Sequence, residues 1–393
     1  VMENNPLWLH ITDIFQDKVK KYDIVKRLIK QREIEDISHD MHSTLEDNLY
    51  SIRKINDREF KEQEVPTKAT IKEAIDIFYI VNAAGVNLTD AELALAQISG
   101  YWPEARALFK EKLKKLNDNG FVFKLDFIIY VLLGILHNVG SKMEKLHDSS
   151  NNDRIREVWG ILDNEILDYT FNILKSQAYI DHTKEVNSVY AFVPIIVYAY
   201  KKGANNLSQL EIKKMVKWFY YSQIRFRYIS QLPQKLDKDI SIIVNENNPF
   251  DKLTNLIALE RNLEISANEF EGVGILHPLW GLMKFYFKSK NAICFSTGIN
   301  IRKNMGKKYE LEWDHIFPYS VLRDNGYGMN NRIKYQYAQE ITNRAVLTAT
   351  ANRTKSAQEA YDYLTDVKEN FPNSLELQCI PDDDNLWKLE NFE

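Results

Sequence analysis

The chain has 393 residues, of which 45% are hydrophobic and 27% charged, and its formal net charge is −4 at pH 7. This length allows two or three domains, and the slightly acidic balance excludes a protein that is basic throughout. The two cysteines, Cys294 and Cys379, form no Cys-x-x-Cys motif, which excludes a paired-cysteine zinc site and disfavours a disulfide-stapled secreted protein.

The first 65 residues alternate charged and apolar positions and are predicted to be mostly helical. Residues 17–32 have a helical apolar pattern, whereas residues 8–15 suit a strand or short turn and residues 49–66 alternate like two short strands. Further on, a helix is expected to end near Asn82, before a turn at Gly85. A capping box of Thr89 and Glu92 then begins the next helix.

Residues 101–298 are predicted to form a helical middle domain, because apolar residues recur there at helical spacing. The pattern is clearest in five segments, 121–137, 155–174, 188–202, 211–230 and 278–287. No signal peptide opens the chain, and the most apolar run, 189–200, is too short to span a bilayer. We therefore expect a cytoplasmic protein without a membrane partner.

An aromatic and basic run at residues 217–228 has two interpretations. Its rings and cations could stack on bases and contact phosphates of a nucleic acid. The same composition is also typical of a core helix with an exposed stripe of arginines.

The C-terminal part contains the residues that could bind a metal or catalyse a reaction. Residues 309–313 suit a strand that ends at Asp314 and His315, and residues 345–348 suit a second short strand. Thr350 can cap a helix that starts near Asn352 and continues through Leu364. The fold class is therefore predicted as mainly α with a small α+β part: a helical scaffold followed by a β-β-α module.

This arrangement fits metal-assisted cleavage of a phosphodiester. Asp314 and Asn352 would supply oxygen ligands to one divalent cation, Mg²⁺ or Mn²⁺, which keeps several waters. His315 would act as the general base, because its unperturbed pKa lies near neutrality. Asn343 would hold the intervening loop and orient the imidazole.

The order Asp-His, Asn, Asn on a β-β-α frame resembles an HNH (ββα-metal) nuclease. Three sequence motifs are more specific, and they resemble the C-terminal nuclease domain of GmrSD-type, modification-dependent restriction endonucleases. They are Trp-Asp-His-Ile-Phe-Pro at 313–318, Asn-Arg-Ala-Val-Leu-Thr at 343–348 and Asn-Arg-Thr-Lys-Ser at 352–356. The resemblance implies that Asp314 and Asn352 are metal ligands, His315 is the base and Asn343 the orienting residue. It also implies defence against phage or other foreign DNA, with recognition of modified bases in some relatives.

Residues 74–95 resemble the latter part of the GmrSD N-terminal domain, which is similar to ParB-type folds and tied to NTP use. The family's nucleotide motif, of the type Asp-Gly-Gln-Gln-Arg, is absent here, so the chain is expected to start partway through that domain. NTP dependence is implied only for a full-length form. The expected domains are a remnant of this N-terminal domain at 1–100, the helical middle at 101–298 and the nuclease domain at 299–393.

The charge around the proposed site differs from that of the whole chain. Between residues 301 and 355, ten Lys and Arg stand against five Asp and Glu, which would attract a polyanion such as DNA. Arg344, Arg353 and Lys355 are candidates for phosphate contacts, and the same region also holds Arg302, Lys303, Lys307 and Lys308. A solvated charged face would have the same composition.

Two other functions stay open. The chain could be a non-catalytic DNA-binding or regulatory protein with a degenerate HNH fold, which is favoured by Asn352, where many HNH enzymes have His, and by the missing nucleotide motif. RNA is also open as a substrate, because a one-metal site acts on either backbone.

Overall fold

A computed structural model describes residues 8–33, 35–59, 62, 64, 66–70, 73, 74, 77, 89–147, 152–301 and 311–393. The chain divides into two compact units, residues 1–69 and 70–393. Helices predominate among the described residues, and the sheet found there has two strands, which confirms a mainly α fold with a small α+β part. None of the helices in these ranges is long and apolar enough to cross a membrane.

The first unit is a small helical cluster. It contains α1 (Ile11–Phe15), α2 (Lys21–Arg32), α3 (His39–Arg53) and the 3₁₀ turn η1 (Lys54–Asp57) around a core of Ile14, Val19, Ile24 and Leu49. The strands predicted at 49–66 are wrong up to residue 57, which is helical. Ser38 caps α3 through Met41 N, and the helix continues through the alternating residues because its Leu49 side is buried.

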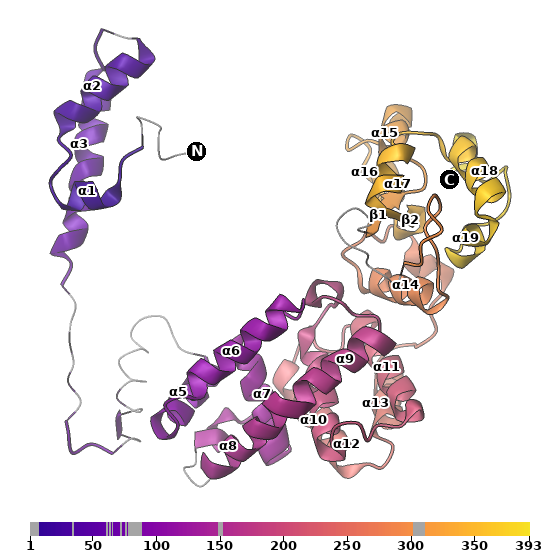
Figure 1. Cartoon of the computed structure of the whole chain (residues 1–393), viewed down its shortest axis with the longest axis horizontal. Coiled ribbons are helices and arrows are strands. Elements are labelled where there is room, and N and C mark those ends of the chain that lie inside the picture. Colours follow the sequence, from indigo (N-terminus) through magenta and orange to yellow (C-terminus); the bar gives the residue numbers. More distant parts are fainter. Residues whose placement is uncertain are drawn as a thin grey trace. The chain divides into compact units, whose positions relative to one another are not determined.

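The second unit begins with a large helical part, shown in Figure 1. Its α-helices are α5 (Asp90–Tyr101), α6 (Ala105–Asp118), α7 (Leu125–His137), α8 (Asn152–Ile161), α9 (Leu167–Gln177), α10 (Phe192–Lys202), α11 (Gln209–Ile224), α12 (Leu232–Asn245), α13 (Pro249–Glu260) and α14 (Pro278–Ser289). Each of the five segments predicted as helical holds at least one of them, which confirms the helical pattern.

Helices α7 and α10 lie at the centre of this part because both are apolar on nearly every side. Their buried residues belong to one continuous core that also takes in α5, α9 and α11. Gly134 lets the two helices approach closely, since a Cβ atom there would lie 2.8 Å from Val197 Cγ2.

The capping box predicted at Thr89 is confirmed: its hydroxyl accepts from Glu92 N, and the Glu92 carboxylate accepts from Thr89 N. The helix it begins, α5, packs into the same core as α7. The helix end and turn predicted at Asn82 and Gly85 lie outside the described residues.

The C-terminal part follows α14 and contains the sheet. Its elements are β1 (Leu311–His315), α15 (Tyr319–Leu322), α16 (Arg332–Ala338), β2 (Arg344–Thr348), α17 (Ala349–Lys355), α18 (Ala360–Asn370) and α19 (Pro372–Leu377). Trp313 anchors this sheet to α14, because its ring lies 4.5 Å from the Trp280 ring and 6.3 Å from the Phe287 ring, centroid to centroid. The helical part thus supports one face of the sheet.

A buried ion pair joins the end of α11 to α12. The Arg227 guanidinium donates to both carboxylate oxygens of Asp239, at 2.7 and 3.1 Å, and the Tyr228 hydroxyl donates to the same carboxylate. Both charged side chains are almost completely buried. Such a pair is costly to break, because removing one partner leaves the other charge without solvation.

We predict that Asp239→Ala lowers the free energy of unfolding by about 3–5 kcal/mol, because the buried Arg227 guanidinium then keeps only the half-exposed Glu260 carboxylate as a charged partner. Asp251→Ala is the matched control, since Asp251 pairs with Lys214 at the surface, where such pairs contribute about 0–1 kcal/mol. Urea unfolding followed by circular dichroism measures both. Equal losses in the two variants would contradict the prediction.

Candidate functional site

The candidate site is built on a β-β-α frame. β1 and β2 pair antiparallel, with Asp314 opposite Ala345 and His315 opposite Arg344. Helix α17 follows β2 directly, and Thr348 caps it by accepting from Ala351 N. The cap is therefore Thr348, not the predicted Thr350.

The continuous helix predicted through Leu364 is wrong. Ser356 has a positive φ of 49°, so α17 ends at Lys355, and α18 begins at Ala360. The residues that were expected to extend one helix instead form a second helix, whose Tyr363, Leu364 and Val367 pack with Ala345 and Leu347 of β2.

Asp314 and Asn352 lie where β1 and α17 pack together. The Asn352 amide donates to the Glu312 carboxylate at 2.7 Å, and the Lys355 ammonium donates to Asp314 Oδ2 at 2.6 Å. Glu312 and Asp314 are two residues apart on a strand and share a face, while Asn352 and Lys355 are three apart on a helix and share another. Asp314 and Asn352 thus both lie at the contact between β1 and α17 but bond different partners, and the residue that bonds Asn352 is Glu312, which the sequence motifs did not single out.

Lys355 does not occupy the position expected of a phosphate contact. Only 3% of it is exposed, and its ammonium is held by Asp314 Oδ2 and by the carbonyl of His315 at 2.7 Å. It also lies 5.5 Å from the centroid of the Tyr363 ring. Its spacing of three residues from Asn352 could have indicated that it faces the strand.

His315 points to the other face of β1, as the alternation of a strand requires. Its Nε2 lies 3.3 Å from Gln339 Oε1, and its ring stacks on Tyr319 with centroids 6.0 Å apart. Burial, with a smaller effect of the nearby Arg344 cation, lowers the pKa of His315 from 6.5 to about 4. The imidazole is therefore neutral at pH 7, but its pKa is not near neutrality as the base role assumed, so it is a weaker base than the sequence suggested.

Asn343 holds the loop but does not contact the imidazole. It is buried; its Oδ1 accepts from Phe317 N at 2.8 Å, and its Nδ2 donates to the carbonyls of Ala338 and Phe317. The predicted role in loop geometry agrees with these contacts. The contact to the imidazole comes instead from Gln339, which nothing in the linear pattern distinguishes from other polar residues.

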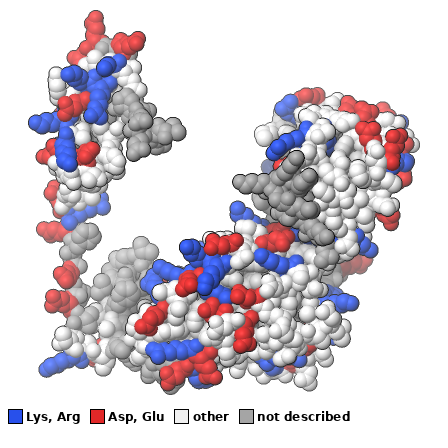
Figure 2. Space-filling model, viewed as in Figure 1, with Lys and Arg blue, Asp and Glu red and all other residues white. Residues whose placement is uncertain are grey.

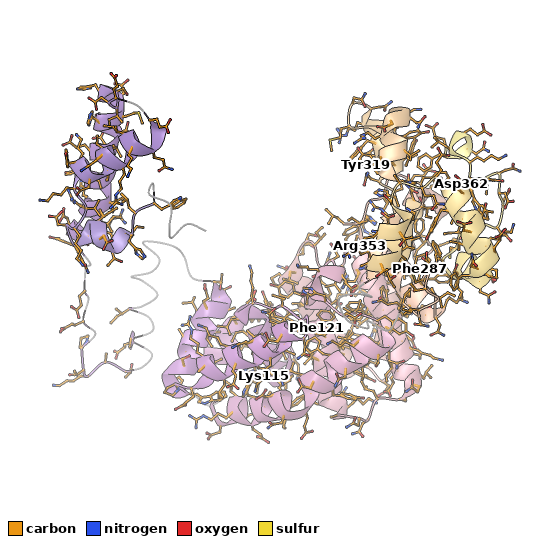
Figure 3. All side chains as sticks on the ribbon, turned by 45° about the horizontal axis from the view of Figure 1, so that its top comes forward. Lys115, Phe121, Phe287, Tyr319, Arg353 and Asp362 are labelled. Carbon is orange, nitrogen blue, oxygen red and sulfur yellow. The ribbon has the colours of Figure 1, made fainter. Side chains whose placement is uncertain are left out.

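The two arginines differ in exposure. Arg344 is partly buried and donates to Gln339 Oε1 at 2.9 Å and to the Trp313 carbonyl at 3.4 Å. Arg353 is exposed on α17, and in Figure 3 it lies with Tyr319 along one side of this part while Asp362 lies along the other. Figure 2 shows Lys and Arg on the side that carries α16 and α17, and Asp and Glu over α18. Arg302, Lys303, Lys307 and Lys308 lie outside the described residues.

The donor set fits one hard divalent cation. Among the described residues no group of three or more His, Cys, Asp or Glu side chains could hold a metal. The candidate set instead combines the carboxylates of Glu312 and Asp314 with the amide of Asn352, and oxygen ligands of this kind suit Mg²⁺ or Mn²⁺ with several waters. The Lys355 ammonium already neutralises the Asp314 carboxylate through Oδ2, so a divalent cation at Asp314 would have to bind through Oδ1, against the repulsion of this ammonium.

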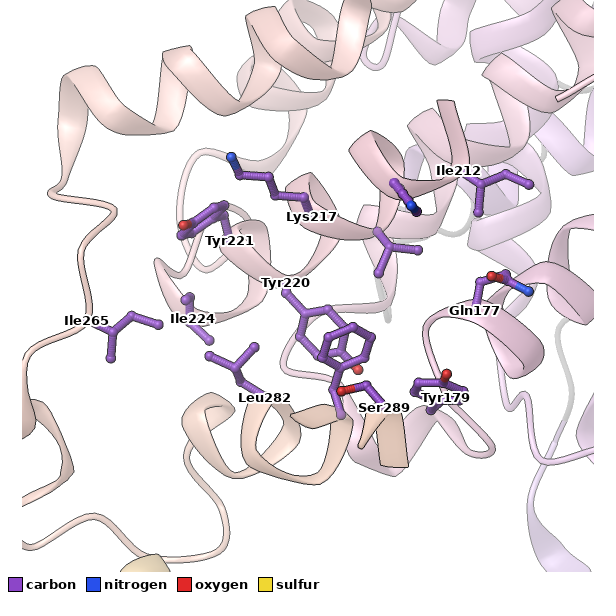
Figure 4. Close-up of a pocket in the computed structure, with 13 residues that line it drawn as sticks. Gln177, Tyr179, Ile212, Lys217, Tyr220, Tyr221, Ile224, Ile265, Leu282 and Ser289 are labelled. Carbon is purple, nitrogen blue, oxygen red and sulfur yellow. The ribbon is translucent and has the colours of Figure 1, made fainter. Parts of the chain in front are cut away.

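The aromatic run at 217–228 is a core helix and not a base-stacking surface. Trp218 and Phe219 are fully buried, Tyr220 donates to the Ala178 carbonyl, and Arg225 and Arg227 are bound in ion pairs. A cavity of about 490 Å³ beside this helix, shown in Figure 4, has mostly apolar walls that include Ile212, Tyr220 and Leu282. None of the candidate site residues lines it.

A second cavity, of about 630 Å³, lies beside the loop held by Asn343. Its lining includes the carboxylates of Glu271, Glu340 and Glu393. These acidic groups make this cavity unfavourable for a phosphate backbone.

No family model and no curated protein matches this chain. The resemblance to GmrSD-type endonucleases therefore stays a prediction from the motifs.

We predict that Asn343→Ala lowers the free energy of unfolding by about 2–4 kcal/mol, because it leaves Phe317 N and the Ala338 carbonyl without their partner. Thr342→Ala is the control, since Thr342 is exposed and bonds only a neighbouring carboxylate. Thermal and urea unfolding measure the difference. A loss as small as that of the control would show that the amide does not hold the loop.

The pH dependence of stability tests the environment of His315. Its pKa is lower in the folded chain, about 4, than the ordinary 6.5, so the unfolded chain binds more protons between these values. The contribution to stability is present above pH 6.5 and is lost as the pH falls toward 4. We expect wild type to lose more unfolding free energy between pH 7 and pH 5 than His315→Gln. Parallel losses in urea titrations would show that the imidazole is not buried.

Proposed function

We propose that this chain is a metal-dependent endonuclease that nicks or cuts DNA. One observation supports the proposal: His315 ends β1, and the preceding strand residues Glu312 and Asp314 bond Asn352 and Lys355 of α17. The proposed base, His315, and one proposed ligand of the cation, Asp314, are thus adjacent residues on a β-β-α frame. The motif resemblance to GmrSD-type nucleases supports DNA as the substrate, with phage or other foreign DNA as the target.

Each residue of the site has a separate role in the proposed reaction. His315 accepts a proton from a water as that water's oxygen forms a bond to phosphorus and the bond to the leaving oxygen breaks. Asp314 and Asn352, with Glu312 beside them, would hold Mg²⁺ or Mn²⁺, which stabilises the charge on the phosphate and leaving oxygens. Arg353, exposed on α17, would contact the phosphate backbone. Lys355 holds Asp314 in place through their ion pair.

A second function is favoured by the ion pair of Lys355 and Asp314. A carboxylate that already has a buried cation needs no metal for charge balance, which fits a DNA-binding or regulatory protein that does not cleave. The two functions differ in their need for a divalent ion and for His315. RNA is a further substrate to test, since a one-metal site acts on either backbone.

The test is nicking of supercoiled plasmid with Mg²⁺, Mn²⁺ or EDTA, on plain DNA and on DNA with modified cytosines. We expect metal-dependent nicking in wild type and a loss of about 10²–10⁴-fold in His315→Ala, the usual contribution of a general base. His42→Ala is the control, because His42 lies in the first unit on α3.

The same samples decide between the two functions. DNA binding that survives EDTA and His315→Ala, with no cleavage by wild type on either DNA, would favour the non-catalytic protein. A parallel assay on single-stranded and duplex RNA tests the third option. Nicking by wild type and His315→Ala at equal rates would remove His315 from the reaction.

A further inference from the structure

Helix α16 reaches the imidazole of His315 by two routes. Tyr335 packs edge-on against Tyr319, with centroids 5.8 Å apart, and Tyr319 stacks on the imidazole. Gln339, one helical turn after Tyr335, contacts the imidazole directly. Gln339 is the C-cap residue that follows α16, so the C-terminal end of this helix supports both the plane and the edge of the ring.

The hydrogen bonds of Gln339 determine which of its atoms faces the imidazole. Arg344 Nη2 lies 2.9 Å from the same atom that lies 3.3 Å from His315 Nε2. A guanidinium has donors only, so this atom must be the carbonyl oxygen and not the amide nitrogen. The side chain cannot flip without placing two donors against each other.

The protonation of His315 follows from this assignment. A carbonyl oxygen only accepts, so the contact with Nε2 is a hydrogen bond only if Nε2 carries the proton. A neutral imidazole with a proton on Nε2 has its lone pair on Nδ1. In the described part of the chain no group is found that hydrogen-bonds Nδ1.

We propose that Gln339 is a positioning residue that holds His315 as the Nε2–H tautomer, which leaves Nδ1 as the atom that takes the proton. Arg344 acts through Gln339: the arginine fixes the amide, and the amide fixes the imidazole. The catalytic consequence rests on the proposed nuclease function, whereas the tautomer itself does not. Arg344 is thereby assigned an internal role in place of the predicted phosphate contact.

Two supports hold the amide in place. The backbone N–H of Gln339 donates to the Tyr335 carbonyl at the end of α16. Arg344 is the first residue of β2 and lies directly opposite His315 in the register, so its guanidinium is brought to the same strand end. Because α16 lies between the two strands in sequence, the segment that joins them also orients the base.

The experiment compares Gln339→Leu, Gln339→Glu and Gln336→Leu in the full chain. Gln336 is exposed on the same helix, so Gln336→Leu repeats the substitution away from the site. Gln339→Glu keeps an oxygen that can accept from both His315 and Arg344, so it should keep the wild-type tautomer. This variant tests the inference even if Gln339→Leu folds poorly. Nitrogen NMR of ¹⁵N-histidine protein at neutral pH, with His315→Ala to assign the signal, reports the tautomer. Single-turnover nicking reports the rate, and DNA binding the affinity.

We expect wild type, Gln336→Leu and Gln339→Glu to show the Nε2–H tautomer, and Gln339→Leu to show a mixture. The nicking rate of Gln339→Leu should fall by about 10–100-fold, typical of losing a partner that orients a functional histidine, with DNA affinity unchanged. An unchanged His315 signal in Gln339→Leu overturns the inference, whether or not the protein cleaves. If wild type does not nick, the nuclease proposal fails, and the NMR comparison alone decides the role of Gln339.

Discussion

The buried ammonium of Lys355 is the contact on which the geometry of the site depends. It binds the side chain of Asp314 and the carbonyl of His315, so one cation bonds to two consecutive residues at the end of β1. A buried charge is stable only while its partners stay in place, which makes the strand end and α17 a single rigid unit. Asn352, one turn earlier on α17, is then held over Glu312. The oxygen atoms that suit a cation are gathered by this ion pair and not by the sheet alone.

The helical part contributes to the site through Trp313. This residue lies on the same face of β1 as His315, and it packs between Trp280 and Phe287 of α14. Since the ring anchors the strand from the face opposite Asp314, the two faces of β1 are fixed by different parts of the chain. The orientation of His315 is therefore supported by aromatic packing, and that of Asp314 by an ion pair.

Local patterns predicted much of the fold, and contacts between distant residues explain what they missed. The strands ending at His315 and Thr348 and the capping box of Thr89 rest on neighbouring residues, and all are present. Residues 49–57 alternate like a strand, yet they belong to α3 and η1, because burial of Leu49 in the small core decides their structure. The motifs placed Asp314 at the end of a strand and Asn352 on the following helix, and both lie there. The burial of Lys355 and the contact of Gln339 depend on how α16 and α17 pack, which the spacing of polar residues does not encode.

The opposite directions of Asp314 and His315 limit how a substrate can enter. Neighbouring side chains of a strand lie on different faces, so no ligand resting on one side of the sheet touches both. A phosphate that meets the imidazole and the carboxylate together must curve around the terminal edge of β1, where the chain turns into Ile316 and Phe317. Such an approach requires a backbone that bends locally or is already bent. Under the nuclease function proposed above, flexibility of the polymer at one nucleotide step, more than its sequence, would govern which sites are cleaved first.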